Sequence, residues 1–489
     1  MHASWPSLLS VLSLAAFIRA ETPNPASPPT PSPFEGVWLG TVTLPNGRTD
    51  IGFAFKRDPK TQALNASFTM PAMFIPKMGL GPAQITDGTY TLDDFGVKLS
   101  LPDDKLVGTF ANSLLHVELQ RADHFPAVAP LPDLPAGPAP LWTTSLGAET
   151  WATPVARDGI IYLGCVDGKF HALRASDGSE KWSWTGENPI YGQALVTDDR
   201  IYFLDHENAV VALNRADGHL LWRASIFDQG YTGKPAPKNP TFNRRVPTPV
   251  ITDNTLFIGS TDHGLYALDA TTGKINWRHD VGAAVFATVT VDGGELIVGS
   301  YDGGIEILDR ATGAETMRTK IGGQIASAPV VAGDTLLVGC RDYLLYGLKR
   351  SDLSVVWRDS YWFSWVESVP VVVDGLAYIG GSDYRRISAI EPSTGKARWA
   401  TDVRGIAWGT PVVTTHSVYE GTSAQNPAAI HHEGGITALD RITGKVKWRH
   451  VTPLPPKAER AGYIGSLVLV DGKIIGAGFD GVVVAYPAN

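Results

Sequence analysis

Short runs of apolar and polar residues alternate along most of the chain, and turn-forming residues separate them. A period of two is typical of β-strands, whose successive side chains point to opposite faces of a sheet. One clear stretch predicts four successive strands, at residues 247–253, 255–261, 264–270 and 275–280. Before the fourth, Gly273 supplies the left-handed conformation that a tight turn requires. The pattern predicts four-stranded antiparallel units rather than long helices.

This unit recurs along the chain. The segment FHALRASDGSEKW, residues 170–182, returns as VVALNRADGHLLW, LYALDATTGKINW, IEILDRATGAETM, LYGLKRSDLSVVW, ISAIEPSTGKARW and ITALDRITGKVKW. A large apolar residue closes each copy, at Trp182, Trp222, Trp277, Met317, Trp357, Trp399 and Trp448, and Trp142 precedes the series. Self-similarity at about 40 residues indicates a propeller or solenoid. We expect these tryptophans to pack between neighbouring units, with Met317 as a flexible substitute.

The two ends of the repeat region predict how the ring closes. The last unit offers only three strands, at residues 462–470, 472–479 and 481–487, whereas residues 138–146 have an outer-strand pattern without a unit of their own. Pairing the two would remove exposed sheet edges. The sequence therefore predicts an all-β protein whose residues 141–489 form an eight-bladed β-propeller, with N- and C-terminal strands closing one blade.

Four further segments precede the propeller. Residues 1–20 resemble a secretory signal peptide, since the apolar stretch 8–18 is too short to span a bilayer and Ala20 suits cleavage. Proline-rich linkers are predicted at residues 21–34 and 123–140. Between them, residues 35–122 alternate in the manner of a small β-sandwich or half-barrel. We therefore expect a periplasmic or secreted protein without a transmembrane segment, and without a cysteine for lipid attachment.

Charge and cysteine content narrow the possible functions. The formal net charge is −8, which argues against a nucleic-acid partner. The two cysteines, Cys165 and Cys340, occupy the same position in units four apart, and so face each other across an eightfold ring. A disulfide needs Cα atoms within about 7 Å. We predict two buried free thiols and a monomeric protein.

The motif ALD-x-x-TG-x-x-x-W, preceded by PVV-x-DG and VGS-x-DG, resembles the pyrroloquinoline-quinone-type propeller repeat. That family includes quinoprotein dehydrogenases and the BamB-type scaffold of outer-membrane protein assembly. The resemblance implies the fold and an extracytoplasmic setting, but a fold does not fix a function. Quinoprotein alcohol dehydrogenases carry adjacent cysteines and a Ca²⁺ ligand set, neither of which is matched here. The assembly scaffold is a lipoprotein without an additional N-terminal β-domain.

A candidate binding site lies where the inner strands begin. In a four-stranded blade, the connections between blades share one face with the turns between second and third strands, and the longest insertions fall there. Aromatic and charged residues on this long-loop face suggest a ligand pocket, the alternative being a channel plugged by bulky side chains. The candidates are Trp151, Tyr191, His206, Arg245, Phe286, Trp365, Glu367, Trp408 and Tyr463.

A metal site is a weaker hypothesis. Adjacent side chains in an extended segment point in opposite directions, so His431 and His432 would not share an ion. Only His431 with Glu433, joined by His206 from a distant blade, could do so. We predict no metal. The chain also lacks a nucleophile elbow, a phosphate-binding loop and a dinucleotide fingerprint, so catalytic residues are not identified.

Two functional hypotheses follow. The first is an exported binding protein that holds a small molecule, such as a carbohydrate, or a protein partner on the long-loop face. The second is an enzyme with its site in the aromatic funnel. It would be either a dehydrogenase dependent on pyrroloquinoline quinone and Ca²⁺, or a carbohydrate hydrolase or lyase using Glu367, Arg245 and His206.

Overall fold

The computed structural model describes residues 31–44, 47–71, 75–92, 97–110, 115–127, 131–227, 246–361, 364–425 and 431–488. Within them the regular elements are β-strands and one short 3-10 turn, at Pro102–Asp104. None of the described helices is long and apolar enough to cross a membrane. Residues 1–30, with the predicted signal peptide, lie outside the described part of the chain.

The first nine strands form a single curved sheet. They are β1 (Gly36–Leu44), β2 (Gly47–Arg57), β3 (Leu64–Met70), β4 (Ile75–Pro82), β5 (Gln84–Thr86), β6 (Thr89–Leu92), β7 (Val97–Ser100), β8 (Leu106–Phe110) and β9 (Leu115–Ala122). Their order is β4-β3-β2-β1-β9-β8-β7-β6-β5, so the two ends of the sheet are separated by only Ala83 in sequence. The front domain is thus a nearly closed barrel, the second of the two predicted forms.

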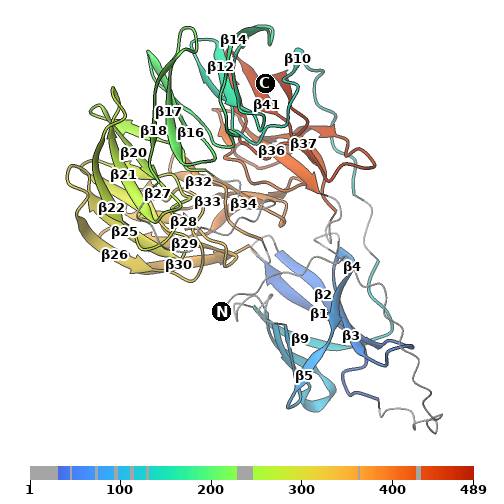
Figure 1. The fold of residues 1–489 in the computed structure, drawn as a ribbon. Helices are drawn as coiled ribbons and strands as arrows, with labels where there is room; N and C mark the ends of the chain where they lie inside the picture. The colour runs from blue at the N-terminus through green and yellow to red at the C-terminus, as the bar shows by residue number, and fades with distance from the viewer. Residues whose placement is uncertain are drawn as a thin grey trace, which may run out of the picture.

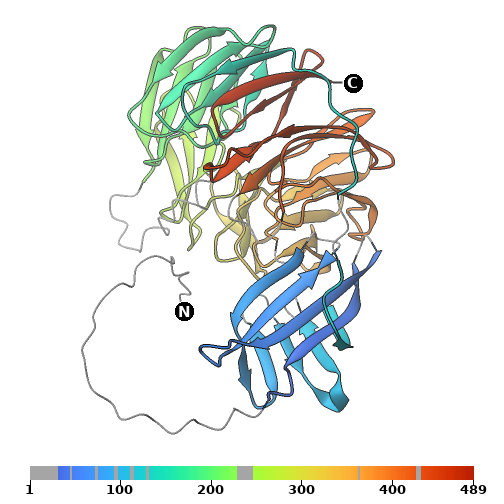
Figure 2. The same ribbon diagram turned by 90° about the vertical axis from the view of Figure 1, so that its right-hand side faces the viewer.

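Alternation fills the barrel with apolar side chains. Trp38, Phe53, Phe55, Tyr90 and Leu99 are all at most 2% exposed, and their intervening neighbours face outward. The same apolar cluster continues into Tyr361, Val366 and Tyr384 of the propeller. Figure 1 and Figure 2 both show the blue barrel beside the yellow-to-red blades on one side of the ring. The front domain is therefore packed on the propeller.

All but one of the remaining strands form eight four-stranded blades, as predicted. Blade one contains β11 (Val155–Arg157), β12 (Ile160–Gly164), β13 (Lys169–Arg174) and β14 (Glu180–Thr185); blade two contains β15 (Leu195–Val196), β16 (Arg200–Leu204), β17 (Ala209–Asn214) and β18 (Leu220–Ser225). Blade three contains β19 (Val250–Thr252), β20 (Thr255–Gly259), β21 (Gly264–Asp269) and β22 (Ile275–Asp280); blade four contains β23 (Thr290–Asp292), β24 (Glu295–Gly299), β25 (Gly304–Asp309) and β26 (Glu315–Lys320).

Blade five contains β27 (Val330–Ala332), β28 (Thr335–Gly339), β29 (Leu344–Lys349) and β30 (Val355–Ser360); blade six contains β31 (Val371–Val373), β32 (Leu376–Gly381), β33 (Arg386–Ile390) and β34 (Ala397–Asp402). Blade seven contains β35 (Val412–Val413), β36 (Ser417–Gln425), β37 (Gly434–Asp440) and β38 (Val446–Thr452), with β39 (Arg460–Gly462) paired to β36. Blade eight joins β40 (Val468–Val470), β41 (Lys473–Ala477) and β42 (Val482–Pro487) to β10 (Trp142–Ser145). The predicted closure by strands from both ends is confirmed.

Neighbouring blades are joined by a repeated contact between a tryptophan and a glycine. The indole of Trp182 lies against Gly218 of the next blade, where an added Cβ would come within 2.4 Å of the ring. Its Nε1–H donates to the carbonyl of Arg215 at 3.2 Å. The same glycine contact recurs for Trp142, Trp222, Trp277, Trp357 and Trp399. These tryptophans are structural, as predicted.

Where blade five meets blade four, both partners of this contact are replaced, and the two replacements fit each other. Leu353 replaces the turn glycine and adopts φ 57°, a conformation that is costly for a leucine. The preceding blade carries Met317 instead of tryptophan, and the two side chains belong to one apolar cluster in which Leu353 is 1% exposed. The leucine fills space that an indole occupies elsewhere.

We predict strong coupling between these two positions. Met317→Trp alone should overpack the site and destabilise the protein by about 1–3 kcal/mol. Leu353→Gly alone should also destabilise it, because the cavity it leaves costs more than the relief of the leucine's positive φ gains. The double variant restores the common pair, so it should be more stable than the two single effects added together. Thermal unfolding of all four proteins measures the coupling.

Gly313→Leu is the matched control, because it places leucine against an existing indole, Trp277. It should lower the melting temperature without any compensating partner. Strict additivity in the Met317 and Leu353 cycle would contradict the interpretation.

Candidate functional site

Eight equivalent positions surround the axis of the propeller. Each lies four residues before the first residue of an inner strand, and all eight line one cavity of about 140 Å³. We call this set the axial ring: Trp151, Tyr191, Val246, Phe286, Ala326, Glu367, Trp408 and Ile464. One residue from each blade therefore faces the same space on the long-loop face.

A second ring lies two residues further along each strand and is mainly polar. It comprises Thr153, Gln193, Thr248, Thr288, Ala328, Val369, Thr410 and Ser466. The Thr248 amide donates to Thr288 Oγ1 at 3.0 Å in the next blade. The amides of Thr410 and Ser466 likewise donate to Ser466 Oγ and Thr153 Oγ1, at 2.7 and 3.0 Å. These bonds link neighbouring inner strands and hold the axial ring in shape.

Glu367 is the only charged member of the axial ring. Its side chain is 3% exposed, and Arg341 Nε donates to its Oε1 at 2.5 Å. Arg341 also donates to the hydroxyl of Tyr301 at 2.7 Å, and its guanidinium lies 4.3 Å from the centroid of Trp365. A buried carboxylate needs such a partner because its desolvation is otherwise costly. The arrangement holds the carboxylate in a fixed position.

Sequence reasoning missed Arg341, although a second column of the repeat contains it. His206, Tyr301, Arg341 and Phe479 occupy corresponding positions in the turns between second and third strands. Each packs behind an axial-ring residue. Ring centroids are 5.2 Å apart for Tyr191–His206, 4.9 Å for Phe286–Tyr301 and 5.0 Å for Trp151–Phe479. Comparing this column across the repeats would have revealed the supporting set.

The predicted site residues divide into three groups. Trp151, Tyr191, Phe286, Glu367 and Trp408 line the cavity. His206 and Trp365 lie behind it, and contact Tyr191 and Arg341 respectively.

Tyr463, another predicted site residue, does not line the cavity. Tyr463 is 3% exposed and packs in the core between blades seven and eight, while the next residue, Ile464, faces the axis. Adjacent side chains of an extended segment alternate in direction, so an error of one residue changes the surroundings completely. Arg245 lies outside the described residues.

The rim of the cavity carries further charges around Trp151. Glu149 accepts a hydrogen bond from Trp151 Nε1. On the indole face, the guanidinium of Arg460 lies 4.8 Å from the ring centroid. Trp151 is thus oriented by a carboxylate at its edge and a cation over its face.

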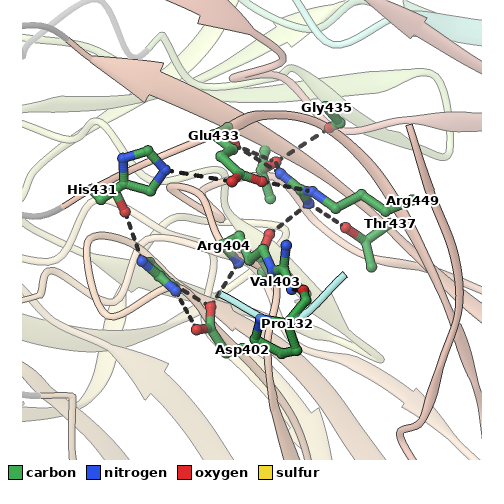
Figure 3. Close-up of polar contacts among 11 residues, drawn as sticks. Pro132, Asp402, Val403, Arg404, His431, Glu433, Gly435, Thr437 and Arg449 are labelled. Carbon is green, nitrogen blue, oxygen red and sulfur yellow. Dashed lines mark hydrogen bonds and ion pairs between the residues drawn. The ribbon is translucent and has the colours of Figure 1, made fainter. Parts of the chain in front are cut away.

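Away from the axis, the second linker is fixed to blade seven (Figure 3). Arg404 donates to the carbonyl of Pro132, and Ala136 forms a parallel bridge with Arg449 of β38. Arg449 in turn reaches the carboxylate of Glu433 at 3.3 Å and the carbonyl of Val403 at 2.6 Å. Burial lowers the pKa of Arg449 to about 10. This cluster attaches the chain leaving the front domain to the long-loop face.

The same cluster bears on the metal hypothesis. His431 Nε2 lies 3.4 Å from Glu433, whose carboxylate also pairs with Arg449 (Figure 3). Among the described residues, the one group with metal-like spacing is instead His279, Glu306 and Glu315 on blades three and four. Arg318 pairs with both of those glutamates, and His279 lies 2.8 Å from Glu306. We interpret it as an ion-pair network.

The two cysteines behave as the sequence predicts. Both are buried and free, on blades one and five. Burial raises the pKa of the Cys165 thiol to about 12, and it raises that of Cys340 as well. Neither thiol is activated as a nucleophile.

Comparison with known proteins assigns the sequence to a family. The model of the family described as "Outer membrane protein assembly factor BamB" matches residues 135–226, 232–360 and 359–489. The chain belongs to this family. BamB from Yersinia pestis is 28% identical over 154 residues, which cover 29% of this chain and 36% of that protein.

Quinone-dependent enzymes are also similar. A 1-butanol dehydrogenase (quinone) from Thauera butanivorans is 28% identical over 175 residues, 33% of this chain and 27% of the enzyme. The chain thus matches a minor part of either curated relative. The crystal structure of a quinohemoprotein alcohol dehydrogenase from Comamonas testosteroni superposes with a TM-score of 0.54 at 14% identity, covering 72% of this chain and 76% of that one. This likeness shows the shared fold alone.

The described lining of the axial cavity does not fit the quinone cofactor of those enzymes. Pyrroloquinoline quinone carries three carboxylates, but the one charged group of this lining is the carboxylate of Glu367. A volume of about 140 Å³ is close to the roughly 150 Å³ that accommodates benzene, and a tricyclic quinone is larger. A single carboxylate is also a poor site for Ca²⁺, which takes six to eight oxygen ligands.

Glu420 is a buried carboxyl in blade seven, the blade that carries the linker cluster formed by Pro132, Arg404, Glu433 and Arg449. It is fully buried on β36, opposite Thr437 of β37, and both of its oxygens lack a hydrogen-bond partner among the described residues. Burial raises the pKa of Glu420 well above its usual value of 4.5. The folded protein therefore binds this proton more tightly than the unfolded chain does.

We predict that Glu420 makes stability fall as pH rises. Its contribution is fully present below the unfolded pKa and is lost as pH rises towards the raised folded pKa. Each tenfold difference in proton affinity is worth about 1.4 kcal/mol. Glu420→Gln should match the wild type in thermal stability at pH 4 and exceed it at pH 8. The exposed Glu459→Gln is the control, and parallel pH profiles for all three proteins would refute the prediction.

Proposed function

We propose that this chain is an exported, BamB-like binding protein that holds a small ligand or a protein partner on its long-loop face. The observation that carries the proposal is the axial ring. Four of its eight positions are aromatic, and a fifth is a buried carboxylate held by Arg341. A channel sealed only against water would need no charged group, since burying one is costly.

The position of the front domain supports a role for this face. Its apolar core continues into Val366, the residue directly before Glu367. The linker cluster also lies on the long-loop side of blades six and seven (Figure 3). The front domain therefore packs against the segment that carries Glu367.

The described residues favour binding over catalysis. An acid–base mechanism needs a second titratable group within hydrogen-bond reach of the reacting atoms. Beside Glu367, which is paired with Arg341, the described lining offers only the phenol of Tyr191 as a titratable group. Residues 1–20 and the family relationship support export to the periplasm or beyond.

The first test is a thermal-shift panel with pyrroloquinoline quinone plus Ca²⁺, and with neutral oligosaccharides. A ligand at a hundred times its Kd stabilises the native state by about 2.7 kcal/mol, which corresponds to a rise of several degrees. A rise that Trp408→Leu abolishes would support binding at the axial cavity. A rise with the quinone would instead revive the dehydrogenase hypothesis.

Binding of a protein partner is tested by a second experiment, photo-crosslinking. A photo-crosslinking amino acid at Glu149, on the rim, should capture a defined partner in cells, whereas the same group at Asp253, on the opposite face, should not. Equal capture at both positions, together with a silent ligand panel, would contradict the proposed function.

A further inference from the structure

We propose that the axial cavity binds a small quaternary or methylated ammonium ion. This inference rests on the proposed function, because it specifies the ligand of the same site. It follows from the charge, the aromatic faces and the size of the cavity.

The charge of the lining favours a cation. Glu367 lines the cavity, whereas its partner Arg341 does not, and the described lining contains no basic side chain. Arg341 is held behind the carboxylate by the hydroxyl of Tyr301 and the ring of Trp365. Neutral and polar groups complete the lining. A ligand on the axis therefore meets the carboxylate before it meets the guanidinium.

The aromatic residues provide the second requirement. Trp151, Tyr191, Phe286 and Trp408 occupy four positions around one space. Aromatic faces attract cations through their quadrupole, by about 2 kcal/mol or more when water is excluded, and cages of such rings recognise quaternary ammonium groups. One face of Trp151 is already covered by the guanidinium of Arg460, 4.8 Å from the ring centroid, so a ligand would use its other face and the three remaining rings. The hydrogen bond from its Nε1 to Glu149 further enriches the ring in electron density.

Size and polar contacts restrict the ligand further. A cavity of about 140 Å³ matches a group the size of benzene, and a trimethylammonium group is of that order, whereas larger ligands need about 300 Å³ or more. Ser327 also lines the cavity. It is 2% exposed, and its Oγ has no hydrogen-bond partner among the described residues. A ligand that carries a hydroxyl beside its ammonium group could satisfy it.

Calorimetric titration with choline, at constant ionic strength, tests the proposal. Its neutral carbon isostere, 3,3-dimethyl-1-butanol, has the same shape without the charge. We expect choline to bind at least tenfold more tightly than the isostere and to change tryptophan fluorescence. Glu367→Gln and Trp408→Leu should each weaken choline binding tenfold or more.

Asp359→Asn is the matched control. Asp359 is also a largely buried carboxylate paired with a buried arginine, Arg386, at 3.1 Å, but it does not line the cavity. Its variant should keep wild-type affinity, and melting temperatures without ligand will report whether each variant folds. Trp408→Leu keeps the test valid if Glu367→Gln does not fold.

Three outcomes would overturn the inference: no choline binding by the folded wild type, equal affinity for the neutral isostere, or equal weakening by Asp359→Asn. If choline fails while an oligosaccharide or a crosslinked partner depends on the long-loop face, the proposed function stands and the ammonium ligand alone is refuted.

Discussion

The pairing of β10 with β42 is the contact on which the rest of the propeller depends. It joins Trp142 to Ala485 and Ser145 to Val482 in antiparallel register, and so completes the eighth blade from both ends of the repeat region. Each blade buries its two apolar faces against its two neighbouring blades, so an unclosed ring would expose one apolar face at each of its ends. The pairing lies on the outer side of blade eight, away from the axis. It nevertheless brings the start of blade one beside blade eight, so Trp151 and Ile464 line one continuous axial ring only when the propeller is closed.

The outer and the axial positions of the blades serve different roles. Six outer positions repeat the same tryptophan–glycine contact, which serves stability, and the departure at Met317 is compensated locally by Leu353. The axial positions do not repeat. Placing Glu367 there required Arg341, Tyr301 and Trp365 from three separate connections. The site is therefore a departure from symmetry, supported by a second layer on the same face.

Much of the fold could be predicted from the sequence, because blade strands, turn glycines and closing tryptophans recur at a regular spacing. Five ring residues could also be predicted, since they differ in bulk or charge from the repeat. The position of Tyr463 could not, because the side of an extended segment that faces the axis changes with a shift of one residue. Nor could the docking of the front domain, which depends on Tyr361 and Tyr384 lying together only in the folded ring.

The closing strand β10 is synthesised long before the strand with which it pairs. β10 is made early, but about 340 residues separate Ser145 from its partner Val482. At a synthesis rate of 5–20 residues per second, β10 waits roughly 20 to 70 seconds for that partner. The linker at Ala136 waits almost as long for Arg449 of blade seven. During this interval both β10 and the linker lack their partners, so each must be kept from pairing elsewhere.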